Sequence, residues 1–223
     1  MRPLVILRPE PGAGASLERA ETLGLVPVWM PLFGVRPLAW TAPDPASFDA
    51  VLATSANAMR HGGAGLTQFQ HLPLHAVGEA TAEAACEAGF THVSAGSGDV
   101  DALLGSLSPR LRLFHPCGRD RRELSAARQV ILSVPVYAAE ALPMPEGFAA
   151  IADAVIAVHS PRAGSRLSEL ADAAGIDRLR VQIVAISEAA AAEAGVGWGT
   201  VKWATEPNDS ALLELAARLC KKP

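Results

Sequence analysis

The chain has 223 residues, half of them hydrophobic and only 5% aromatic, so it can form one large or two small domains with aliphatic cores. Its formal charge is −4 and no basic block is present, which argues against a nucleic-acid partner. No stretch approaches the roughly 18 apolar residues of a membrane span. The N-terminal apolar run, 4–7, is too short for a secretory signal.

Short apolar runs alternate with Ala-rich segments of helical period, a pattern typical of βαβ units around parallel sheets. In chain order, the predicted strands are 4–7, 26–30, 50–53, 74–77, 92–94, 111–115, 134–137, 154–158, 181–186 and 201–203. The predicted helices include 16–23, 80–88, 165–174 and 189–194. Gly24, Gly89 and Gly175 follow three of these helices and are expected to end them.

The chain also repeats itself. Three segments of its first half recur later, at separations of 104, 109 and 109 residues: 49–55 in 153–160, 76–80 in 185–189, and 101–104 in 210–213. A fourth match runs out of order, because 6–9 followed by 26–28 resembles 113–116 followed by 134–136. The pattern indicates a duplication in which one copy takes its last two strands from the N-terminus.

This order predicts that one lobe is inserted in the other. Residues 1–33 and 147–223 are expected to form the discontinuous first lobe, and 34–146 the inserted second lobe. Two Pro-rich stretches, about 34–45 and 137–146, are the expected extended crossovers between them. The predicted fold class is therefore α/β, with two flavodoxin-like parallel-sheet lobes joined by a two-stranded linker.

Ligands of open parallel sheets bind beyond the carboxyl ends of the strands, where this chain has small polar residues, glycines and arginines. One interpretation is helix capping, in which Thr54 or Ser55, Ser160 and Asp209 cap helices without any ligand. The other is anion capture by the N–H groups of several helix starts that face one cleft.

Charged and aromatic residues at strand ends are further candidates. In the anion interpretation, Arg8, Arg119 and Arg162 would be bidentate partners of carboxylates. His115 and His159 also lie at strand ends, although such a histidine is often only a hydrogen-bonding residue.

Tyr137 is the only tyrosine, and it ends a Val-rich strand at a crossover. It could be a buried anchor or a proton donor near a leaving hydroxyl, and its position alone favours neither.

Other chemistries have little support. No GxGxxG follows a strand, and neither GxxxxGK[ST] nor GxSxG is present. The six histidines do not pair at metal spacing, and Cys86, Cys117 and Cys220 lie far apart. We therefore expect no metal, no nucleotide, and free thiols in a reducing cytoplasm.

Six short motifs together resemble the uroporphyrinogen-III synthases over nearly the whole chain. They are Ile6–Pro9, 54–58, 76–81, Gly118-Arg119, Val136-Tyr137 and 160–163. The resemblance implies cyclisation of hydroxymethylbilane to uroporphyrinogen III with inversion of ring D and loss of water, without metal or cofactor. The implied route loses the terminal hydroxyl to give an azafulvene, passes through a spiro intermediate at ring D, then fragments and recloses.

The resemblance also implies where the substrate is held, namely between two lobes joined by a two-stranded ladder. It implies that Tyr137 assists loss of the hydroxyl. The expected substrate contacts are Arg8, Thr54, Ser55, Asn57, Gly78, Thr81, Gly118, Arg119, Ser160, Arg162 and Ser187. The chain departs from the family at Ser187–Ala190, where members typically have Gly-x-x-Thr; Gly78 and Thr81 keep that pattern in the other copy.

Two alternatives remain open at this point. One is a catalytically degenerate two-lobed clamp that binds an anionic tetrapyrrole or another polycarboxylate, which the altered Ser187 turn favours. The other is a nucleotide-dependent enzyme on two Rossmann-like lobes, against which the missing phosphate motifs argue. The expected setting is a cytoplasmic monomer with a small-molecule substrate, hydroxymethylbilane, received by transient hand-over from the preceding enzyme.

Overall fold

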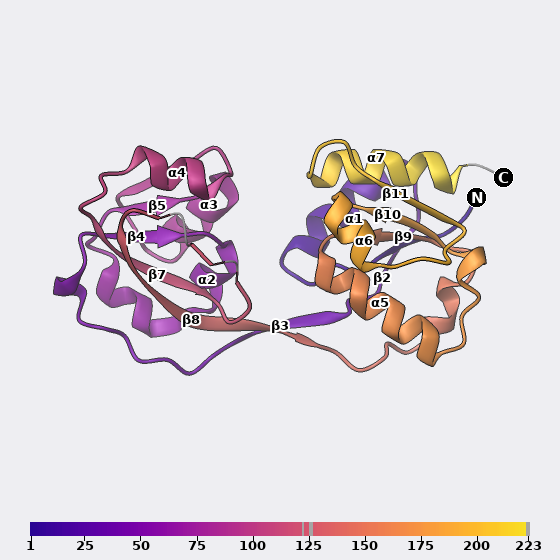
Figure 1. Ribbon diagram of the computed structural model, residues 1–223, viewed down its shortest axis with the longest axis horizontal. Coiled ribbons are helices and arrows are strands. Elements are labelled where there is room, and N and C mark those ends of the chain that lie inside the picture. Colours follow the sequence, from indigo (N-terminus) through magenta and orange to yellow (C-terminus); the bar gives the residue numbers. More distant parts are fainter. Residues whose placement is uncertain (122, 125–126, 222–223) are drawn as a thin grey trace. The chain divides into compact units, whose positions relative to one another are not determined.

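The computed structural model describes residues 1–121, 123–124 and 127–221, and the chain forms two compact units. Unit 1 comprises Met1–Gly34 and Glu140–Pro223, and unit 2 comprises Val35–Ala139. In the sequence, unit 2 is therefore an insertion into unit 1. Each unit is built on one β-sheet (Figure 1).

Unit 1 is a three-layer α/β unit. Its elements are β1 (Leu4–Ile6), α1 (Gly12–Thr22), β2 (Pro27–Trp29), β9 (Val155–Val158), α5 (Pro161–Ala173), β10 (Gln182–Ala185), α6 (Glu188–Glu193), β11 (Thr200–Trp203) and α7 (Asp209–Cys220). The strands pair in parallel in the order β11-β10-β9-β1-β2, which is 2-1-3-4-5 in the flavodoxin sense.

The apolar runs of unit 1 are continuous because both faces of its sheet are covered. Leu4 and Ile6 pack with α1 and α7, whereas the alternating Val5 and Leu7 pack with α5 and α6. Figure 1 shows these helices on the two sides of the strands.

Unit 2 has the same architecture, with one added strand. Its elements are β3 (Phe33–Pro37), β4 (Ala50–Ala53), α2 (Ala56–His61), β5 (Leu74–Ala76), α3 (Glu79–Glu87), β6 (Val93–Ala95), α4 (Val100–Ser106), β7 (Arg112–Gly118) and β8 (Val130–Ala141). The sheet order is β3-β8-β7-β4-β5-β6, and β4 to β8 pair in parallel. Short 3₁₀ helices lie at Pro45–Ser47, Gly63–Phe69, Phe148–Ile151 and Arg178–Arg180.

The chain passes between the units in β3 and in β8. The N–H of Leu38 donates to the carbonyl of Val136 at 2.9 Å, and that of Leu142 donates to Leu32, also at 2.9 Å. From the pair 32 and 142 to the pair 38 and 136, the residue number increases in β3 and decreases in β8, so these two strands run antiparallel. The sequence predicts extended crossovers here, and they form a paired two-stranded segment.

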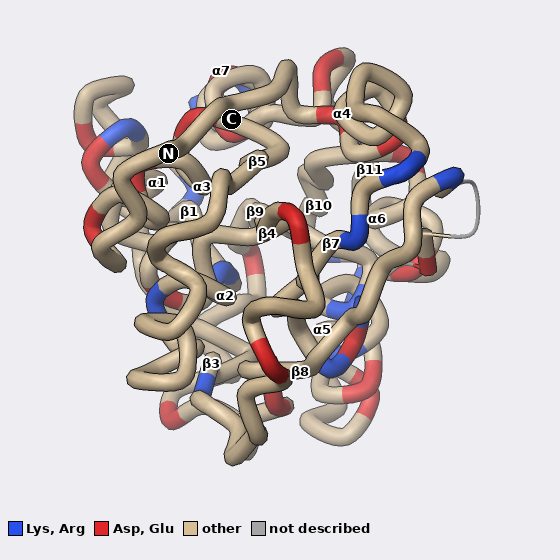
Figure 2. Tube along the Cα trace, turned by 90° about the vertical axis from the view of Figure 1, so that its left-hand side faces the viewer, with Lys and Arg blue, Asp and Glu red and all other residues tan. Residues whose placement is uncertain are grey.

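The α/β prediction with two mainly parallel sheets is confirmed, and each of the ten expected strands overlaps a strand of the structure. Gly24, Gly89 and Gly175 have φ of 74°, 92° and 64°, a left-handed conformation that favours glycine directly after a helix. Among the described residues, no helix has both the length and the apolar character that a membrane crossing requires. Basic and acidic residues are interspersed along the trace (Figure 2).

Strand pairing fixes how the two units correspond. Leu4 pairs with Val155 in unit 1, and Leu113 pairs with Ala50 in unit 2. Val155 and Ala50 each stand five residues before the serine that caps the next helix. Leu4 and Leu113 are therefore equivalent, and β9, β10, β11, β1 and β2 of unit 1 match β4, β5, β6, β7 and β8 of unit 2.

The fourth sequence match is wrong in register. Pro27 pairs with Leu4 at the start of β1, whereas Pro135 pairs with Cys117 near the end of β7. The chain after β2 continues beside β1, where the N–H of Met30 donates to the carbonyl of Ile6. Counted along the paired strands, residues 31–33 correspond to 135–137. A Val-Pro-Val triplet does not specify register, but strand pairing does.

Candidate active site

A hollow of about 250 Å³ lies at the carboxyl ends of the unit 2 strands. It is lined by Thr54, which follows β4, by Val77, which follows β5, and by the segment after β6, Gly98 to Val100. This edge is the expected ligand position in an open parallel sheet, and the order of strands reverses between β4 and β7 beside Thr54.

Thr54 is held from behind by a buried histidine. The Oγ1 of Thr54 and the Nε2 of His115 are 2.9 Å apart, and the Nδ1 of His115 is 2.9 Å from the Oγ of Ser133. His115 is only 1% exposed. Burial, with a smaller contribution from the charge of Arg121, lowers the pKa of His115 to about 4, so its ring is neutral at pH 7.

Tyr137, in β8, lies beside the start of α2. Its hydroxyl donates to the Oγ of Ser55 at 3.1 Å, and the same Oγ accepts the N–H of Asn57 at 3.2 Å. Ser55 is thus the N-cap of α2, which decides between the two capping candidates at that turn. Tyr137 is half-buried and packs against the core of unit 2.

Gly118 makes room for the Tyr137 ring. A Cβ at Gly118 would lie 2.9 Å from Cζ and 3.0 Å from the hydroxyl oxygen of Tyr137, closer than a side chain tolerates. The register of β7 and β8 shifts at this point, and Gly118 pairs directly with Tyr137. The N–H of the exposed Arg119 donates to the Tyr137 carbonyl at 2.9 Å. The Gly118-Arg119 motif therefore contacts the tyrosine.

The start of α3 differs from its neighbours because Gly78, its N-cap, makes no side-chain capping bond. The first N–H groups of a helix have no partner within the helix. Thr81 stands three positions later, and its own N–H donates to the Gly78 carbonyl at 3.0 Å. The uncapped turn follows directly after Val77, which lines the hollow.

In unit 1, two helix starts are capped by serines that the sequence places at the site. Ser160 accepts the N–H of Ala163 at 3.2 Å, and Ser187 accepts that of Ala190 at 3.3 Å. Ser187 therefore supplies a cap where Gly78 of unit 2 does not. The guanidinium of Arg162 lies 4.8 Å from the centre of the Phe33 ring, within cation–π range.

Arg8 belongs to a network centred on Asp209. Its Nη1 lies 3.7 Å from the Asp209 carboxylate and donates to the Oγ of Ser16 at 3.3 Å. Asp209 also accepts hydrogen bonds from Ser16 and from His159 Nε2, each at 2.8 Å, and pairs with Arg19. The expected substrate contact Arg8 is thus engaged with an internal carboxylate.

The carboxyl group of Asp209 is strongly stabilised in its charged form. Burial by itself would raise its pKa, but the hydrogen bonds from His159, Ser16 and Arg19 outweigh burial and hold the pKa at about 2. The prediction that Asp209 caps α7 is wrong, because Asn208 is the N-cap and accepts the N–H of Ala211 at 2.9 Å. Asp209 is one residue further on, and its side chain instead contacts α1 and the residues that follow β1 and β9.

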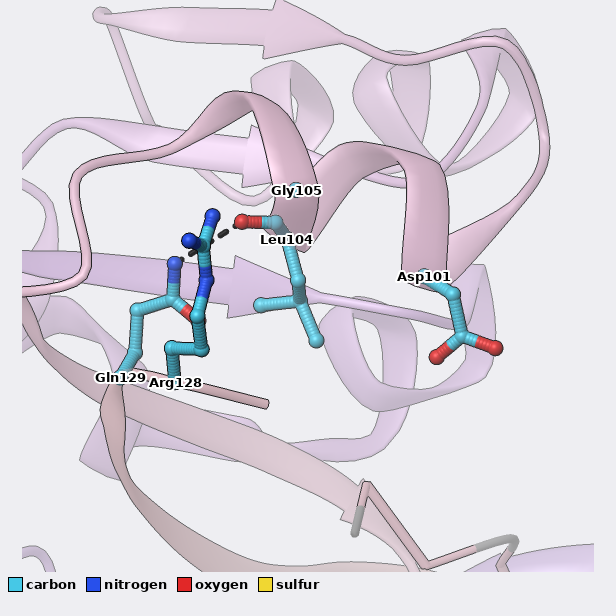
Figure 3. Close-up of a pocket in the computed structure, with 5 residues that line it drawn as sticks. All are labelled: Asp101, Leu104, Gly105, Arg128 and Gln129. Atoms are coloured by element: carbon cyan, nitrogen blue, oxygen red, sulfur yellow. Dashed lines mark hydrogen bonds between the residues drawn. The ribbon is translucent and has the colours of Figure 1, made fainter. Parts of the chain in front are cut away.

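A second, smaller cavity of unit 2 has a structural explanation. It measures about 70 Å³ and is lined by Asp101, Leu104, Gly105, Arg128 and Gln129 (Figure 3). The Gln129 amide donates to the carbonyls of Leu104, Leu107 and Ser108, at 2.8, 3.2 and 3.4 Å. These are the last carbonyls around the end of α4, so Gln129 closes that helix.

Within residues 1–121, 123–124 and 127–221, no group of three or more His, Cys, Asp or Glu side chains has metal-binding geometry. All three cysteines are free, with Cys117 and Cys220 buried and Cys86 exposed.

Of the site residues that the sequence predicts, the structure gathers Thr54, Ser55, Asn57, Gly118 and Tyr137 in unit 2, and places Arg8, Ser160, Arg162 and Ser187 in unit 1.

The chain is similar to proteins of known family and structure. The family model of uroporphyrinogen-III synthase HemD matches residues 15–214. The structure of uroporphyrinogen-III synthetase from Helicobacter pylori is similar, with a TM-score of 0.69, 17% identity, and coverage of 98% of this chain and 100% of the other. A mutant uroporphyrinogen III synthase from the extremely thermophilic bacterium Thermus thermophilus gives a TM-score of 0.55 at 21% identity, with 100% of both chains covered. At these identities the structures show a shared fold. Comparison with curated protein sequences gave no significant match.

Proposed function

The chain belongs to the uroporphyrinogen-III synthase family, and from this premise we propose how its residues carry out the family's reaction. The enzyme cyclises hydroxymethylbilane to uroporphyrinogen III, with inversion of ring D and loss of water. The observation that carries the residue assignment is the hydrogen bond from Tyr137 to Ser55 at the start of α2.

Tyr137 and Ser55 form a pair of hydroxyl groups suited to assist loss of the substrate hydroxyl. The Ser55 Oγ accepts from both Tyr137 and Asn57, so its own proton remains available as a donor. As the terminal C–O bond breaks, the leaving oxygen takes a proton from Tyr137, either directly or through Ser55, and departs as water. The proton released when ring D regains aromaticity restores the hydroxyl.

Unit 2 also supplies donors for the carboxylates of the substrate. Thr54 lines the hollow, and the start of α3 after Gly78, which no side chain caps, directly follows Val77. Thr81, whose own N–H already donates to the Gly78 carbonyl, is proposed to contact the substrate through its hydroxyl. Helix starts favour anions because their N–H groups lack partners and the helix dipole is positive there. Arg119 is a further candidate at the exposed end of β7.

In unit 1, the proposed contacts are Ser160, Arg162 and Ser187, at the starts of α5 and α6. Ser187 remains a candidate despite its departure from the family motif, because its hydroxyl accepts from Ala190 and keeps its own proton. Arg8 is the weakest candidate, since its Nη1 already donates to Ser16 and lies near the Asp209 carboxylate.

Few catalytic groups are needed for this chemistry. Hydroxymethylbilane also closes unaided, without inversion, so the enzyme must favour one substrate conformation. Orientation alone can supply about 7–11 kcal/mol of a barrier in favourable cases. Several fixed carboxylate contacts are suited to this purpose, and one hydroxyl pair assists the departure of water.

The decisive assay supplies hydroxymethylbilane, oxidises the products and resolves isomers I and III by chromatography. We expect isomer III to form faster than spontaneous closure to isomer I. Isomer I alone, at the spontaneous rate, would contradict the synthase function. Saturable binding without turnover would instead indicate the degenerate clamp, which the family match does not favour.

We further propose a cytoplasmic monomer that receives its substrate by transient hand-over. The free thiols support a reducing compartment. Light scattering during size exclusion measures the mass directly, and a mass twice the 23.2 kDa of the chain would contradict the monomer.

A further inference from the structure

His115 joins three neighbouring strands of unit 2 through its ring. It lies in β7, its Nε2 contacts Thr54 after β4, and its Nδ1 contacts Ser133 in β8, with which it also pairs in register. Both ring nitrogens therefore have a hydroxyl partner at 2.9 Å. At 1% exposure, the ring has little access to solvent.

A neutral imidazole carries one N–H, so the two hydroxyl partners cannot both accept from it. With the proton on Nδ1, His115 donates to Ser133, and its bare Nε2 accepts the proton of Thr54. With the proton on Nε2, His115 donates to Thr54, and its bare Nδ1 accepts the proton of Ser133. The low pKa of His115, about 4, keeps the ring neutral during an assay near pH 7.

The two tautomers have opposite consequences for the hollow. In the Nδ1–H form, the Thr54 hydroxyl donates its hydrogen bond to His115, and only the lone pairs of the Thr54 oxygen are available to the hollow. In the Nε2–H form, Thr54 accepts from His115, and its hydroxyl can donate a hydrogen bond to a group in the hollow. A carboxylate can only accept hydrogen bonds, so it selects the second form.

We infer that His115 is a positioning residue that, through Thr54, presents a hydrogen-bond donor to a substrate carboxylate in the hollow of unit 2. The inference rests on the proposed function for the identity of the ligand. The hollow, at about 250 Å³, has room for an acidic substituent of a pyrrole. Its lining includes Asp99, whose Oδ1 is held by the N–H groups of Asp101 and Ala102 at 2.7 and 2.9 Å, which offsets part of its charge.

The first test is a double-mutant cycle on His115→Leu and Thr54→Val. Thr54→Val should raise KM for hydroxymethylbilane about tenfold, as expected for a lost hydrogen bond to a charged group. His115→Leu should raise KM severalfold, because the Thr54 hydroxyl remains but loses the partner that positions it. Both variants should change kcat less than KM. Because His115 acts through Thr54, the double variant should be no worse than Thr54→Val alone. Full additivity, or a loss confined to kcat, would overturn the inference.

His75→Leu is the matched control. It makes the same chemical change in the same sheet and removes a comparable contact, between His75 Nδ1 and Ser94 Oγ at 2.8 Å. His75 does not line the hollow, so its KM should stay within about twofold of the wild type. An equal rise in KM in this variant would show a general effect on the sheet.

The second test needs no variant, so it does not depend on folding of His115→Leu. ¹⁵N spectra of histidine-labelled wild-type protein report which nitrogen of His115 carries the proton. With uroporphyrin III, the stable oxidised product, bound at saturation, His115 should be in the Nε2–H form, and an Nδ1–H form in that complex would overturn the inference. If the wild-type protein makes only isomer I, the proposed function is contradicted. If it makes isomer III but the effects of the His115 and Thr54 variants on KM are additive, only the role of His115 is contradicted.

Discussion

The two units share a scaffold but differ in the chemistry at equivalent positions. Ser55 and Ser160 cap equivalent helices, and the strands around them pair in the same order. Tyr137, beside Ser55, corresponds to Phe33, which lies beneath Arg162 at the equivalent helix start. The two units therefore present equivalent edges, of which only the one in unit 2 carries a phenolic hydroxyl.

The hollow of unit 2 shows the same contrast. Thr54 and Val100, which line it, correspond to His159 and Asp209 in unit 1, where the two side chains are hydrogen-bonded at 2.8 Å. Unit 1 thus fills the equivalent space with an internal carboxylate that binds its own cationic partners. In the proposed function, unit 2 supplies the hydroxyl chemistry, whereas Arg8 and Arg19 of unit 1 contact the Asp209 carboxylate of the same unit.

The largest expected effect comes from making unit 2 resemble unit 1. Tyr137→Phe removes the hydroxyl and keeps the ring against Gly118. We expect turnover to fall by roughly one to three orders of magnitude, in line with loss of general-acid assistance. The decrease should appear in kcat for isomer III, with little change in the denaturation midpoint. Unchanged turnover and an unchanged isomer ratio would show that the hydroxyl is not catalytic.

The next prediction concerns the network of unit 1. The pKa of Asp209 in the folded protein is about 2, below the ordinary value of 3.8, so its charge stabilises the fold at neutral pH. That contribution, about 2 kcal/mol, is fully present above pH 4 and is lost as pH falls toward 2. Asp209→Asn should therefore cost about that much stability at pH 7 by urea unfolding.

The pH dependence provides the control for that measurement. The stability difference between wild type and Asp209→Asn should shrink as pH falls from 4 toward 2, because the Asp209 carboxyl is then protonated in the unfolded chain and, near pH 2, in the folded protein as well. A constant difference from pH 7 to pH 3 would mean that lost packing, and not charge, explains the effect. Turnover should fall far less than in Tyr137→Phe, since Asp209 bonds to side chains of unit 1.

Much of the scaffold could be predicted because its signals are local. Buried parallel strands give continuous apolar runs, and glycines with positive φ mark the helix ends, so both are visible in the sequence. The sequence predicts strand β3 only as an extended crossover, because the prolines at 31 and 37 weaken the strand pattern. It indicates Tyr137 and Ser55 as candidate residues, but not the bond between them.

The rest of the site depends on contacts that no local pattern records. Thr54 and His115 are 61 residues apart, and they meet because β4 and β7 pair in a particular register. The sequence predicts Asp209 as a helix cap because Asp is common at N-cap positions. The helix α7 begins one residue earlier than this prediction requires, so Asn208 is the cap and Asp209 bonds to Ser16, Arg19 and His159. The correspondence of Phe33 with Tyr137 was hidden by a chance Val-Pro-Val match.

A smaller effect separates the two capping serines. Ser55→Ala and Ser160→Ala each remove a cap and should each cost about 1 kcal/mol in unfolding free energy. Only Ser55 accepts the Tyr137 hydroxyl, so Ser55→Ala should also lower kcat, by about tenfold. Ser160→Ala should change KM more than kcat. Equal kcat losses in both variants would contradict the division between the units.

The smallest expected effect is the reverse exchange, Phe33→Tyr, which gives unit 1 a phenolic hydroxyl. Phe33 is 9% exposed and lies beneath Arg162, and we expect the added hydroxyl to change stability by about 1 kcal/mol. Turnover should stay within about twofold of the wild type, and the double variant with Tyr137→Phe should remain as slow as Tyr137→Phe alone. We expect position, and not the hydroxyl by itself, to make Tyr137 useful, because Tyr137 bonds to Ser55, which directly follows Thr54 of the hollow. Recovery of activity in the double variant would show instead that the two edges are interchangeable.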